Sequence, residues 1–239
     1  MPKLLGMRLA AVALFLVAHT PGYAQYFDQV RTYVPSDARY ADVGVFARDF
    51  SPRPSNTAPE SLKVSYKRLM PTVELRQGPV EIQFGYTTYP LEGGTRSAIF
   101  LGFTLTGEYV LSGNRMSALV LPLLLTADFT KSGSAGSLHD DFNVASVGIG
   151  TGLRYRTSGS VADFTATVAG VIHYSFEGYS VHSGSSPAII GEAVAVLPQV
   201  PILDGIVLGY RFRYQIWSLE QGYFDYRTIN HGLFIGVLF

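Results

Sequence analysis

The sequence predicts an all-β protein: an antiparallel up-and-down transmembrane β-barrel of about ten strands, with eight strands as the alternative. Three observations lead to this fold class. Apolar residues alternate with small or polar ones over segments of strand length. The segments between them are alternately long and short. Of the 239 residues, 15% are charged, 47% hydrophobic and 13% aromatic, which is fewer charges than a soluble domain usually carries.

The N-terminus has the pattern of a secretory signal peptide. Lys3 and Arg8 precede an apolar run at 9–18, and the letters GYA then stand before Gln25. A basic region, an apolar run and small residues before a cleavage point are typical of a removed leader. The run has about half the residues that a membrane-spanning helix needs. We therefore expect a signal peptide over 1–24, a short N-terminal periplasmic segment over 25–39 and a barrel domain over 40–239.

Alternation is clearest at 206–216, where apolar side chains are separated by Gly209, Arg211, Arg213 and Gln215. A strand of about 11 residues, at roughly 3.3 Å per residue and tilted by about 45°, crosses a bilayer. Strands of soluble proteins usually have about 5–6 residues. Glycines and isolated charges on the opposite face suit the interior of a small barrel. The same alternation occurs at 80–87, 98–105, 145–156 and 231–239.

The connections between expected strands alternate in length, as outer loops and periplasmic turns of membrane barrels do. A sandwich gives no reason for this alternation. Counting back from the C-terminus gives nine strands from residue 62 onward, and 40–50 supplies a tenth. Pro71 and a weak pattern at 188–197 leave eight strands open. The longer connections are 218–227, 177–188, 130–141, 90–97 and 51–61, and the shorter ones are 198–205, 157–160, 110–115 and 77–79.

The final segment, HGLFIGVLF, has Leu233, Ile235, Val237 and Phe239 on one face. With the leader and the alternating strands, it resembles bacterial outer-membrane β-barrel proteins as a class. The chain is most similar to the small barrels of the OmpA/OmpX kind. This resemblance implies a location in the outer membrane of a Gram-negative-type bacterium and contact with outer-membrane lipids. It also implies that the barrel-assembly machinery reads Phe239, Val237 and Ile235 during biogenesis.

Several charged residues fall on the faces expected to point into the lumen. One interpretation is an ion-pair network that fills the barrel, because unpaired charges there are costly. The other is an anion-attracting constriction in a narrow pore. Barrels of about eight strands are filled by side chains and open channels appear nearer 16, which favours the network. Gly148, Gly150 and Gly152 would make room for arginines. The expected lumen charges are Arg154, Arg156, Arg211, Arg213, Glu81 and Glu192, with Glu74 and Asp163.

His173 and Ser175 lie two residues apart, so their side chains share a face of a strand. Glu192 follows on the next expected strand, where a carboxylate could orient the imidazole. The pattern resembles the His-x-Ser…Glu constellation of the outer-membrane lipid A 3-O-deacylases, which are esterases on small barrels. The resemblance implies Ser175 as nucleophile, His173 as base and Glu192 as orienting group. The chain departs from that family: two more strands follow Glu192, Phe176 stands where the family has Asn, and the His173 face is lumenal.

Most aromatic residues near strand ends are interpreted as membrane girdles. Those in the outer loops would alternatively form a binding surface, as loops on a rigid scaffold often do; Tyr179 is one of them. The expected outer-girdle residues are Tyr86, Tyr89, Phe129, Tyr174, Phe176, Trp217, Tyr223, Phe224 and Tyr226, and the expected inner ones are Tyr109 and Tyr155.

Composition argues against several classes of site. A net charge of zero offers no basic footprint for nucleic acid, and the absence of cysteine removes disulfides and thiolate metal sites. His139, Asp140 and Asp141 end a Ser/Gly-rich loop, but a metal needs three or four convergent ligands. We interpret them as a solvated loop tip and expect no metal and no cofactor.

These observations predict a monomeric, non-enzymatic barrel with a structural, binding or narrow-pore role. The role would be exerted through its lumen or through outer loops that contact an unknown extracellular ligand. Two alternatives remain. One is a small-solute, porin-like channel with an Arg-lined lumen, and the other is a lipid A deacylase-like esterase that uses Ser175, His173 and Glu192.

Overall fold

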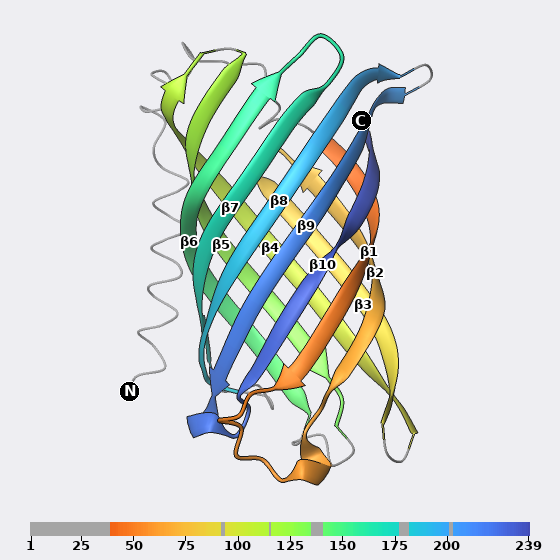
Figure 1. The fold of residues 1–239 in the computed structure, drawn as a ribbon, viewed down its shortest axis with the longest axis vertical. Helices are drawn as coiled ribbons and strands as arrows, with labels where there is room; N and C mark the ends of the chain where they lie inside the picture. Colours follow the sequence, from red (N-terminus) through yellow and green to blue (C-terminus); the bar gives the residue numbers. More distant parts are fainter. Residues whose placement is uncertain (1–38, 92–93, 115, 135–140, 177–181, 201–202) are drawn as a thin grey trace. The chain divides into compact units, whose positions relative to one another are not determined.

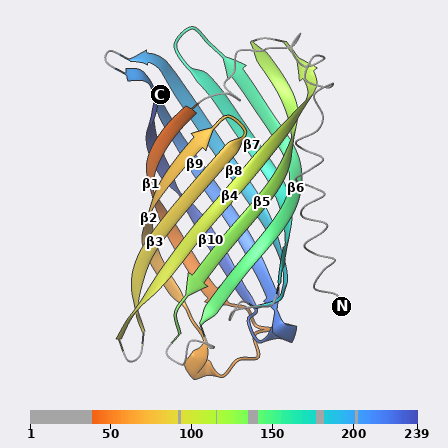
Figure 2. The same cartoon turned by 180° about the vertical axis from the view of Figure 1, so that it is seen from behind.

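The computed structural model describes residues 39–91, 94–114, 116–134, 141–176, 182–200 and 203–239. These residues form a closed barrel of ten antiparallel strands, in which each strand pairs with the next and β1 pairs with β10 (Figures 1 and 2). The predicted all-β up-and-down barrel is confirmed with ten strands, so the eight-strand alternative is wrong. The expected leader and the periplasmic segment up to residue 38 lie outside the described residues. The strands are β1 (Arg39–Pro52), β2 (Tyr66–Gln77), β3 (Val80–Leu91), β4 (Gly94–Gly113), β5 (Ser117–Ser132), β6 (Phe142–Ser158), β7 (Asp163–Ser175), β8 (Gly184–Val200), β9 (Leu203–Leu219) and β10 (Tyr226–Leu238).

The barrel has two ends, which we call the terminal end and the loop end. At the terminal end the backbone N–H of Phe239 donates to the carbonyl oxygen of Arg39 at 3.0 Å. At the loop end, the segment 53–65 contains the 3-10 turn η2 (Glu60–Leu62), and the segment 219–226 contains η3 (Glu220–Gly222). These two segments lie side by side below the strands in Figure 1, in orange and blue. Backbone hydrogen bonds join them, from Arg53 to Asp225 at 2.9 Å and from Thr57 to Gly222 at 3.0 Å.

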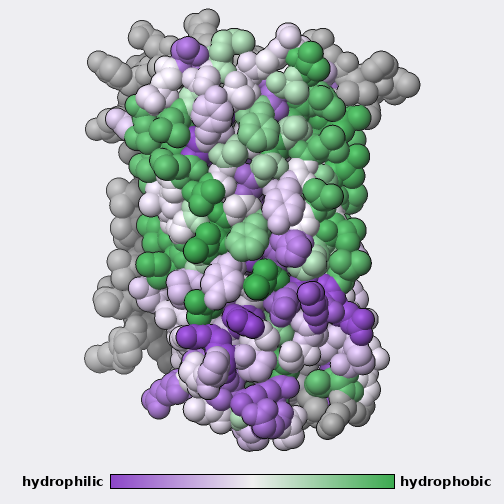
Figure 3. Space-filling view, in the orientation of Figure 1, coloured by the Kyte–Doolittle hydropathy of each residue, from purple (hydrophilic) through white to green (hydrophobic). Residues whose placement is uncertain are grey.

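Alternate residues of the strands face away from the lumen, and most of them are large and apolar. Leu233 is 71% exposed although it lies in the middle of β10. Figure 3 shows apolar side chains over much of the barrel wall, with hydrophilic ones gathered toward the loop end. Soluble monomers rarely expose contiguous apolar patches larger than a few hundred Å², so this exterior suits hydrocarbon. The apolar belt includes Val43, Val45, Leu69, Val73, Ile82, Phe84, Leu101, Phe103, Leu123, Val147, Ile149, Leu153, Val168, Ile172, Ile189, Leu208, Leu233, Ile235 and Val237.

Charged side chains end the belt on its loop-end side. Asp49 lies opposite Lys67 in the β1–β2 ladder, and Ser51 lies opposite Arg227 in the β1–β10 ladder. All four positions share the outward parity of the belt residues on their strands. The belt is therefore bounded by polar side chains, as expected where a barrel wall leaves hydrocarbon.

Some connections are shorter than the sequence predicted. β3 ends at Leu91 and β4 begins at Gly94, with these two residues opposite each other in the ladder. The predicted long connection at 90–97 is therefore wrong, and the long–short alternation fails at this hairpin. Main-chain pairing continues past the point where the side chains stop alternating, because the ladder satisfies backbone groups whatever the side chains are. The same occurs at 198–205, where β8 continues to Val200.

An aromatic cluster fills the lumen at the loop end. The Phe50 ring stacks on Tyr66 and Tyr226 at centroid distances of 5.4 and 4.7 Å, and Tyr66 stacks on Tyr89 at 4.2 Å. The Tyr226 hydroxyl accepts a hydrogen bond from the backbone N–H of Val64 at 3.1 Å, which holds the segment 53–65 over the cluster. The cluster consists of Phe50, Tyr66, Tyr89, Phe142, Trp217, Phe224 and Tyr226, with Val64, Met70 and Phe100 packed among them.

The girdle prediction is wrong for four of these residues, Tyr89, Trp217, Phe224 and Tyr226, which are buried inside the barrel. An aromatic ring near a strand end faces lipid or lumen according to its parity, and composition alone does not reveal which face is inside. Five others are exposed on the outside, in agreement with the prediction: Tyr86, Tyr109, Tyr155, Tyr174 and Phe176.

Candidate functional site

The lumen changes character in layers along β1. From the terminal end toward the loop end, inward positions hold Asp42, Phe46, Arg48 and Phe50. Asp42 belongs to an ion-pair network, Phe46 lines a cavity and Phe50 belongs to the aromatic cluster. The charged middle of the lumen is the candidate functional site.

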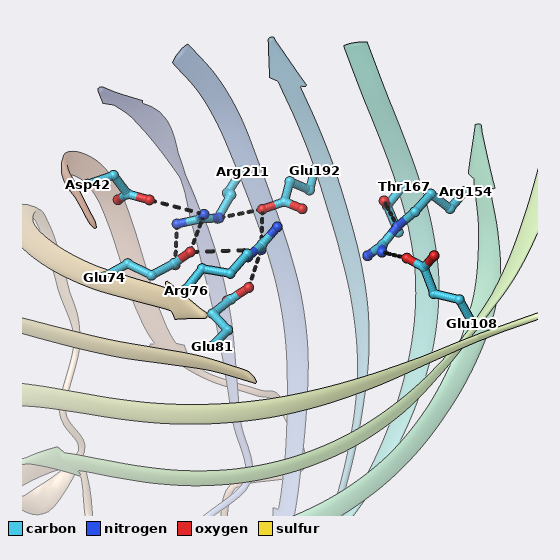
Figure 4. Close-up of polar contacts among 9 residues, drawn as sticks. All are labelled: Asp42, Glu74, Arg76, Glu81, Glu108, Arg154, Thr167, Glu192 and Arg211. Atoms are coloured by element: carbon cyan, nitrogen blue, oxygen red, sulfur yellow. Dashed lines mark hydrogen bonds and ion pairs between the residues drawn. The ribbon is translucent and has the colours of Figure 1, made fainter. Parts of the chain in front are cut away.

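Arg211 on β9 is the centre of the first network (Figure 4). Its guanidinium pairs with Glu74 on β2, where Nη2 lies 2.6 Å from Oε1. The same group lies 2.8 Å from Glu192 Oε1 on β8 and 3.4 Å from Asp42 Oδ2 on β1. The guanidinium carbon of Arg211, Cζ, lies 3.9 Å from the centre of the Phe234 ring. Three carboxylates from three strands therefore share one arginine.

Arg76 on β2 extends this network across the lumen. Its Nη2 pairs with Glu81 on β3 and lies 3.1 Å from Glu192 Oε1 on β8 (Figure 4). The Tyr40 ring centre lies 5.2 Å from the guanidinium carbon. Because β2 and β8 are not neighbours in the sheet, the Arg76–Glu192 pair reaches across part of the lumen.

A second group of charges joins β4, β6 and β7. Glu108 accepts from two arginines, from Arg154 through Oε1 and from Arg156 Nη1 through Oε2 at 2.8 Å. The Nε of Arg154 also donates to Thr167 Oγ1 at 2.9 Å (Figure 4). One carboxylate thus holds the two neighbouring arginines of β6.

A third group surrounds His173, which is fully buried. Its Nδ1 lies 3.0 Å from the Ser186 carbonyl oxygen, and its Nε2 lies 3.0 Å from both Thr126 Oγ1 and Asp128 Oδ2. Asp128 also pairs with Arg213. Both ring nitrogens of His173 are therefore engaged with groups of the barrel itself.

A cavity of about 90 Å³ lies in the lumen among these groups. Its walls are polar on one part, with Arg154, Arg213 and Asn230, and apolar on another, with Phe100 and Leu124. The Oδ1 atom of Asn230 is buried and has no hydrogen-bond partner among the residues that the structure describes. This volume is large enough to hold several water molecules.

The structure places six of the predicted lumen charges, and Glu74, on the inside of the barrel and brings them into contact with partners. Asp163 is the first residue of β7 and is half-buried, with no ion pair among the described residues. Sequence reasoning missed three of these partners, the carboxylates of Asp42, Glu108 and Asp128. Alternation alone points to them, because each has the inward parity of its strand. The six predicted charges and their partners are Arg154 and Arg156 with Glu108, Arg211 with Glu74, Arg213 with Asp128, and Glu81 and Glu192 with Arg76.

The three residues of the expected assembly signal lie on the outside of β10 and just after it. Ile235, Val237 and Phe239 are 52%, 41% and 58% exposed. Leu238 between them is half-buried and packs against the inner cluster of Phe46 and Phe234. The reading of this segment by an assembly machinery stays a prediction.

His173, Ser175 and Glu192 do not form a triad in this structure. Ser175 Oγ donates to the Gly184 carbonyl oxygen at 3.2 Å, and Glu192 pairs with Arg76 and Arg211. In the β7–β8 ladder Glu192 lies opposite Thr167, whereas Ser186 lies opposite His173. Six residues of strand, or about 20 Å, separate Ser186 from Glu192. Asp128 is the carboxylate that faces His173.

The sequence predicted that the glycines of β6 make room for arginines, and this prediction is wrong. A Cβ on Gly148 would lie 2.5 Å from His173 Cδ2 and 2.7 Å from Thr126 Oγ1. On Gly152 it would lie 2.0 Å from the backbone oxygen of Val168. Gly148 therefore accommodates the His173 ring, and Gly152 allows close approach of β7.

We expect Gly148→Ala to lower the free energy of unfolding by about 1–3 kcal/mol, because overfilling a packed interior strains its neighbours. Gly170→Ala is the matched control: it lies on β7, is exposed, and a Cβ there would meet nothing within 4 Å. Urea unfolding in lipid vesicles, followed by the emission of the single Trp217, measures both. Equal stability of the two variants would contradict this packing.

The expected solvated loop tip is only partly described, because His139 and Asp140 lie outside the described residues. Asp141 is buried: its Oδ1 accepts from the Ser134 N–H at 2.7 Å, and its Oδ2 lies 3.4 Å from Lys131 Nζ. The prediction is therefore wrong for Asp141. In the part of the chain that the structure describes, no three His, Cys, Asp or Glu side chains gather as a metal site. No helix there has the length and apolar character to cross a membrane.

Comparisons with known proteins give distant likenesses only. No protein-family model matches the chain, and a search of curated proteins gave no match. OmpTdeltaL8, a loop-deletion mutant of the outer membrane protein OmpT of Vibrio cholerae, is 8% identical with a TM-score of 0.27; the alignment covers 81% of this chain but only 62% of that one. Ail of Yersinia pestis is 10% identical with a TM-score of 0.20, over 85% of this chain and 99% of that one. The toluene transporter TbuX of Ralstonia pickettii is 10% identical with a TM-score of 0.23, over 85% and 90%. These likenesses carry no argument about the fold, which is established by the strand topology of a closed, ten-stranded antiparallel barrel.

Proposed function

We propose that this chain is an integral outer-membrane barrel with a filled lumen, which acts by binding at its loop end and has no catalytic centre. The observation that carries the proposal is the contrast between its two surfaces. Apolar side chains cover the outside, while the inside holds paired charges beneath a packed aromatic cluster. A small barrel in a bilayer requires this distribution.

The connections support an orientation with the terminal end in the periplasm. The turns between β2 and β3 and between β4 and β5 span 78–79 and 114–116, whereas the loop end has the segments 53–65 and 220–225. Barrels of this class keep short turns inside and longer loops outside. The expected signal peptide agrees with export across the inner membrane.

The loop end offers a rigid surface for a partner. Besides the backbone hydrogen bonds between its two segments, Asn56 Nδ2 donates to the Asp225 carbonyl oxygen at 3.1 Å. Arg53 Nη1 donates to Ser218 Oγ at 3.1 Å. Loops that a scaffold holds in place commonly carry binding functions, and this favours a binding role at the loop end.

A planar-bilayer recording tests the filled lumen against the porin-like alternative. We expect no stepwise conductance from the wild-type chain, because the aromatic cluster and the Arg76–Glu192 pair obstruct the lumen at two levels. Stepwise conductance that disappears in the double variant Arg211→Gln/Arg213→Gln would overturn the proposal and establish the channel. Gel mobility of heated and unheated samples confirms that each preparation is folded.

A further inference from the structure

The ladder between β2 and β3 stops halfway along the strands. Pairing runs from Gln77 opposite Val80 to Thr72 opposite Gly85 and does not continue toward the loop end. Beyond that point, residues 66–71 of β2 pair with β1 alone and residues 86–91 of β3 pair with β4 alone. The ribbons of β2 and β3 diverge toward the loop end in both views (Figures 1 and 2). We call this unpaired stretch the seam.

Proline contributes to the seam on both sides. Pro71 on β2 and Pro90 on β3 have no N–H to donate across it. The interruptions near Pro122 in β5 and Pro187 in β8 differ, because pairing resumes on both sides of each proline. One side-chain hydrogen bond crosses the seam, from Thr87 Oγ1 to the Leu69 carbonyl oxygen at 2.8 Å.

The seam reaches into the apolar belt. On its outer side lie Leu69, 64% exposed, and Tyr86, 46% exposed. Unpaired main-chain groups at this depth cost several kcal/mol each in hydrocarbon unless something else satisfies them. Polar groups of a ligand or water therefore have a place to bind where the barrel wall is weakest.

Arg48 lies behind the seam without a counter-ion. Its side chain is almost fully buried, and its contacts are neutral: Nε donates to Tyr66 Oη at 3.1 Å, and Nη1 lies 3.9 Å from Met70 Sδ. Among the described residues no carboxylate lies within ion-pair distance of it, whereas the other arginines of the charged middle all have one. Arg68 lies opposite Arg48 in the β1–β2 ladder and adds a second positive charge.

From this arrangement we infer that Arg48, with Arg68, binds the anionic head of a single-chain amphiphile that enters through the seam from the outer leaflet. A guanidinium matches a carboxylate or phosphate by paired, charge-assisted hydrogen bonds, which supplies the missing counter-ion. The acyl chain lies along Leu69 and Tyr86 in the apolar belt. Met70, an unbranched and adaptable side chain, lies between Arg48 and the seam and moves aside for the head. The inference rests on the proposed membrane location.

The test uses the sole tryptophan as a reporter. Trp217 belongs to the same cluster as Tyr66 and Met70, so a fatty acid with a nitroxide near its carboxyl group should quench its emission saturably in the folded chain in nanodiscs. We expect Arg48→Gln to raise the half-saturating concentration about tenfold or more, the loss typical of a charge-assisted hydrogen bond. Arg48→Lys should restore most of the affinity. Arg227→Gln removes an exposed arginine whose hydrogen-bond partner is Ser51, and it should leave the half-saturating concentration unchanged.

Two further arms identify the ligand. The methyl ester of the same probe lacks the negative charge and should quench without saturation. Inorganic phosphate should displace the probe poorly, because it has no chain for the belt. Equal half-saturation of wild type and Arg48→Gln, or of the acid and its ester, would overturn the site. If phosphate displaced the probe fully and bound as tightly as the probe does, the site would be one for free anions, and the proposal of an amphiphile ligand would be overturned.

Cross-linking the seam tests the route. The chain has no cysteine, so Leu69→Cys with Thr88→Cys can be joined selectively by a short bis-maleimide. We expect the joined protein to lose saturable quenching and the unjoined double variant to keep it. Val43→Cys with Ile235→Cys, opposite each other in the paired β1–β10 ladder, is the control. Full quenching in the cross-linked seam variant would overturn lateral entry. If all of these variants still fold in nanodiscs, the proposal of a membrane barrel stands whatever the result for the seam.

Discussion

Replacing Leu233 with arginine is expected to lower the free energy of unfolding by about 2–4 kcal/mol, the cost of an arginine on the lipid face near the bilayer midplane. Leu233 is 71% exposed and lies opposite Val45, near the middle of β1 and β10. In water, a charge at so exposed a position would change stability by about 0.5 kcal/mol or less. The two surroundings therefore predict clearly different results for one substitution.

Val161→Arg is the control for this experiment. Val161 is an exposed valine, 75% accessible, but it lies in the turn between β6 and β7 and not on the barrel wall. We expect a change of about 0.5 kcal/mol or less there. Urea titrations of both variants in lipid vesicles give the two values. If Leu233→Arg proved as harmless as Val161→Arg, the belt would not face hydrocarbon.

Replacing Arg211 with methionine is expected to lower the free energy of unfolding by about 3–5 kcal/mol, because removing one partner of a buried ion pair leaves the other charge uncompensated. The substitution keeps much of the length of the side chain but abandons Glu74 and Asp42, which are nearly inaccessible. It also removes one of the two cations beside Glu192. The loss should appear as a lower urea midpoint in vesicles.

Arg227→Met provides the comparison, since Arg227 is exposed and, among the described residues, its Nε donates only to Ser51 Oγ at 3.0 Å. Exposed polar contacts of this kind contribute little, so we expect a change of about 0.5 kcal/mol or less. A loss for Arg211→Met no greater than for Arg227→Met would mean that the lumen network does not stabilise the barrel.

Alternation was enough to predict the barrel, because a side-chain period of two reports directly which residues share a face. Arg211, Arg213 and Glu81 could be assigned to the inside for this reason. The same rule failed for Trp217 and Tyr226 because their aromatic character was taken as evidence for the lipid boundary. The parity of Trp217 placed it inside with Arg211 and Arg213 on the same strand, whereas Tyr226 had been assigned to a connection and is the first residue of β10.

Contacts across the lumen could not be predicted from the sequence. Arg76 reaches Glu192 across the barrel, and that distance depends on strand number and tilt, which no local pattern contains. The seam was visible in part, since Pro71 interrupts a predicted strand. Pairing between β2 and β3 does not resume beyond Pro71, and we attribute this to Pro90 on β3. The sequence does not relate the two prolines, because their relative position depends on the register of the strands.

A comparison of the folded state with and without an apolar solvent tests whether hydrocarbon surrounds the barrel wall. The chain is folded in detergent, the detergent is removed completely, and circular dichroism, Trp217 emission and sedimentation are measured. Because the belt needs hydrocarbon around it, we expect the chain to aggregate or to lose its β-structure. A dispersed, fully folded monomer in plain buffer would contradict it.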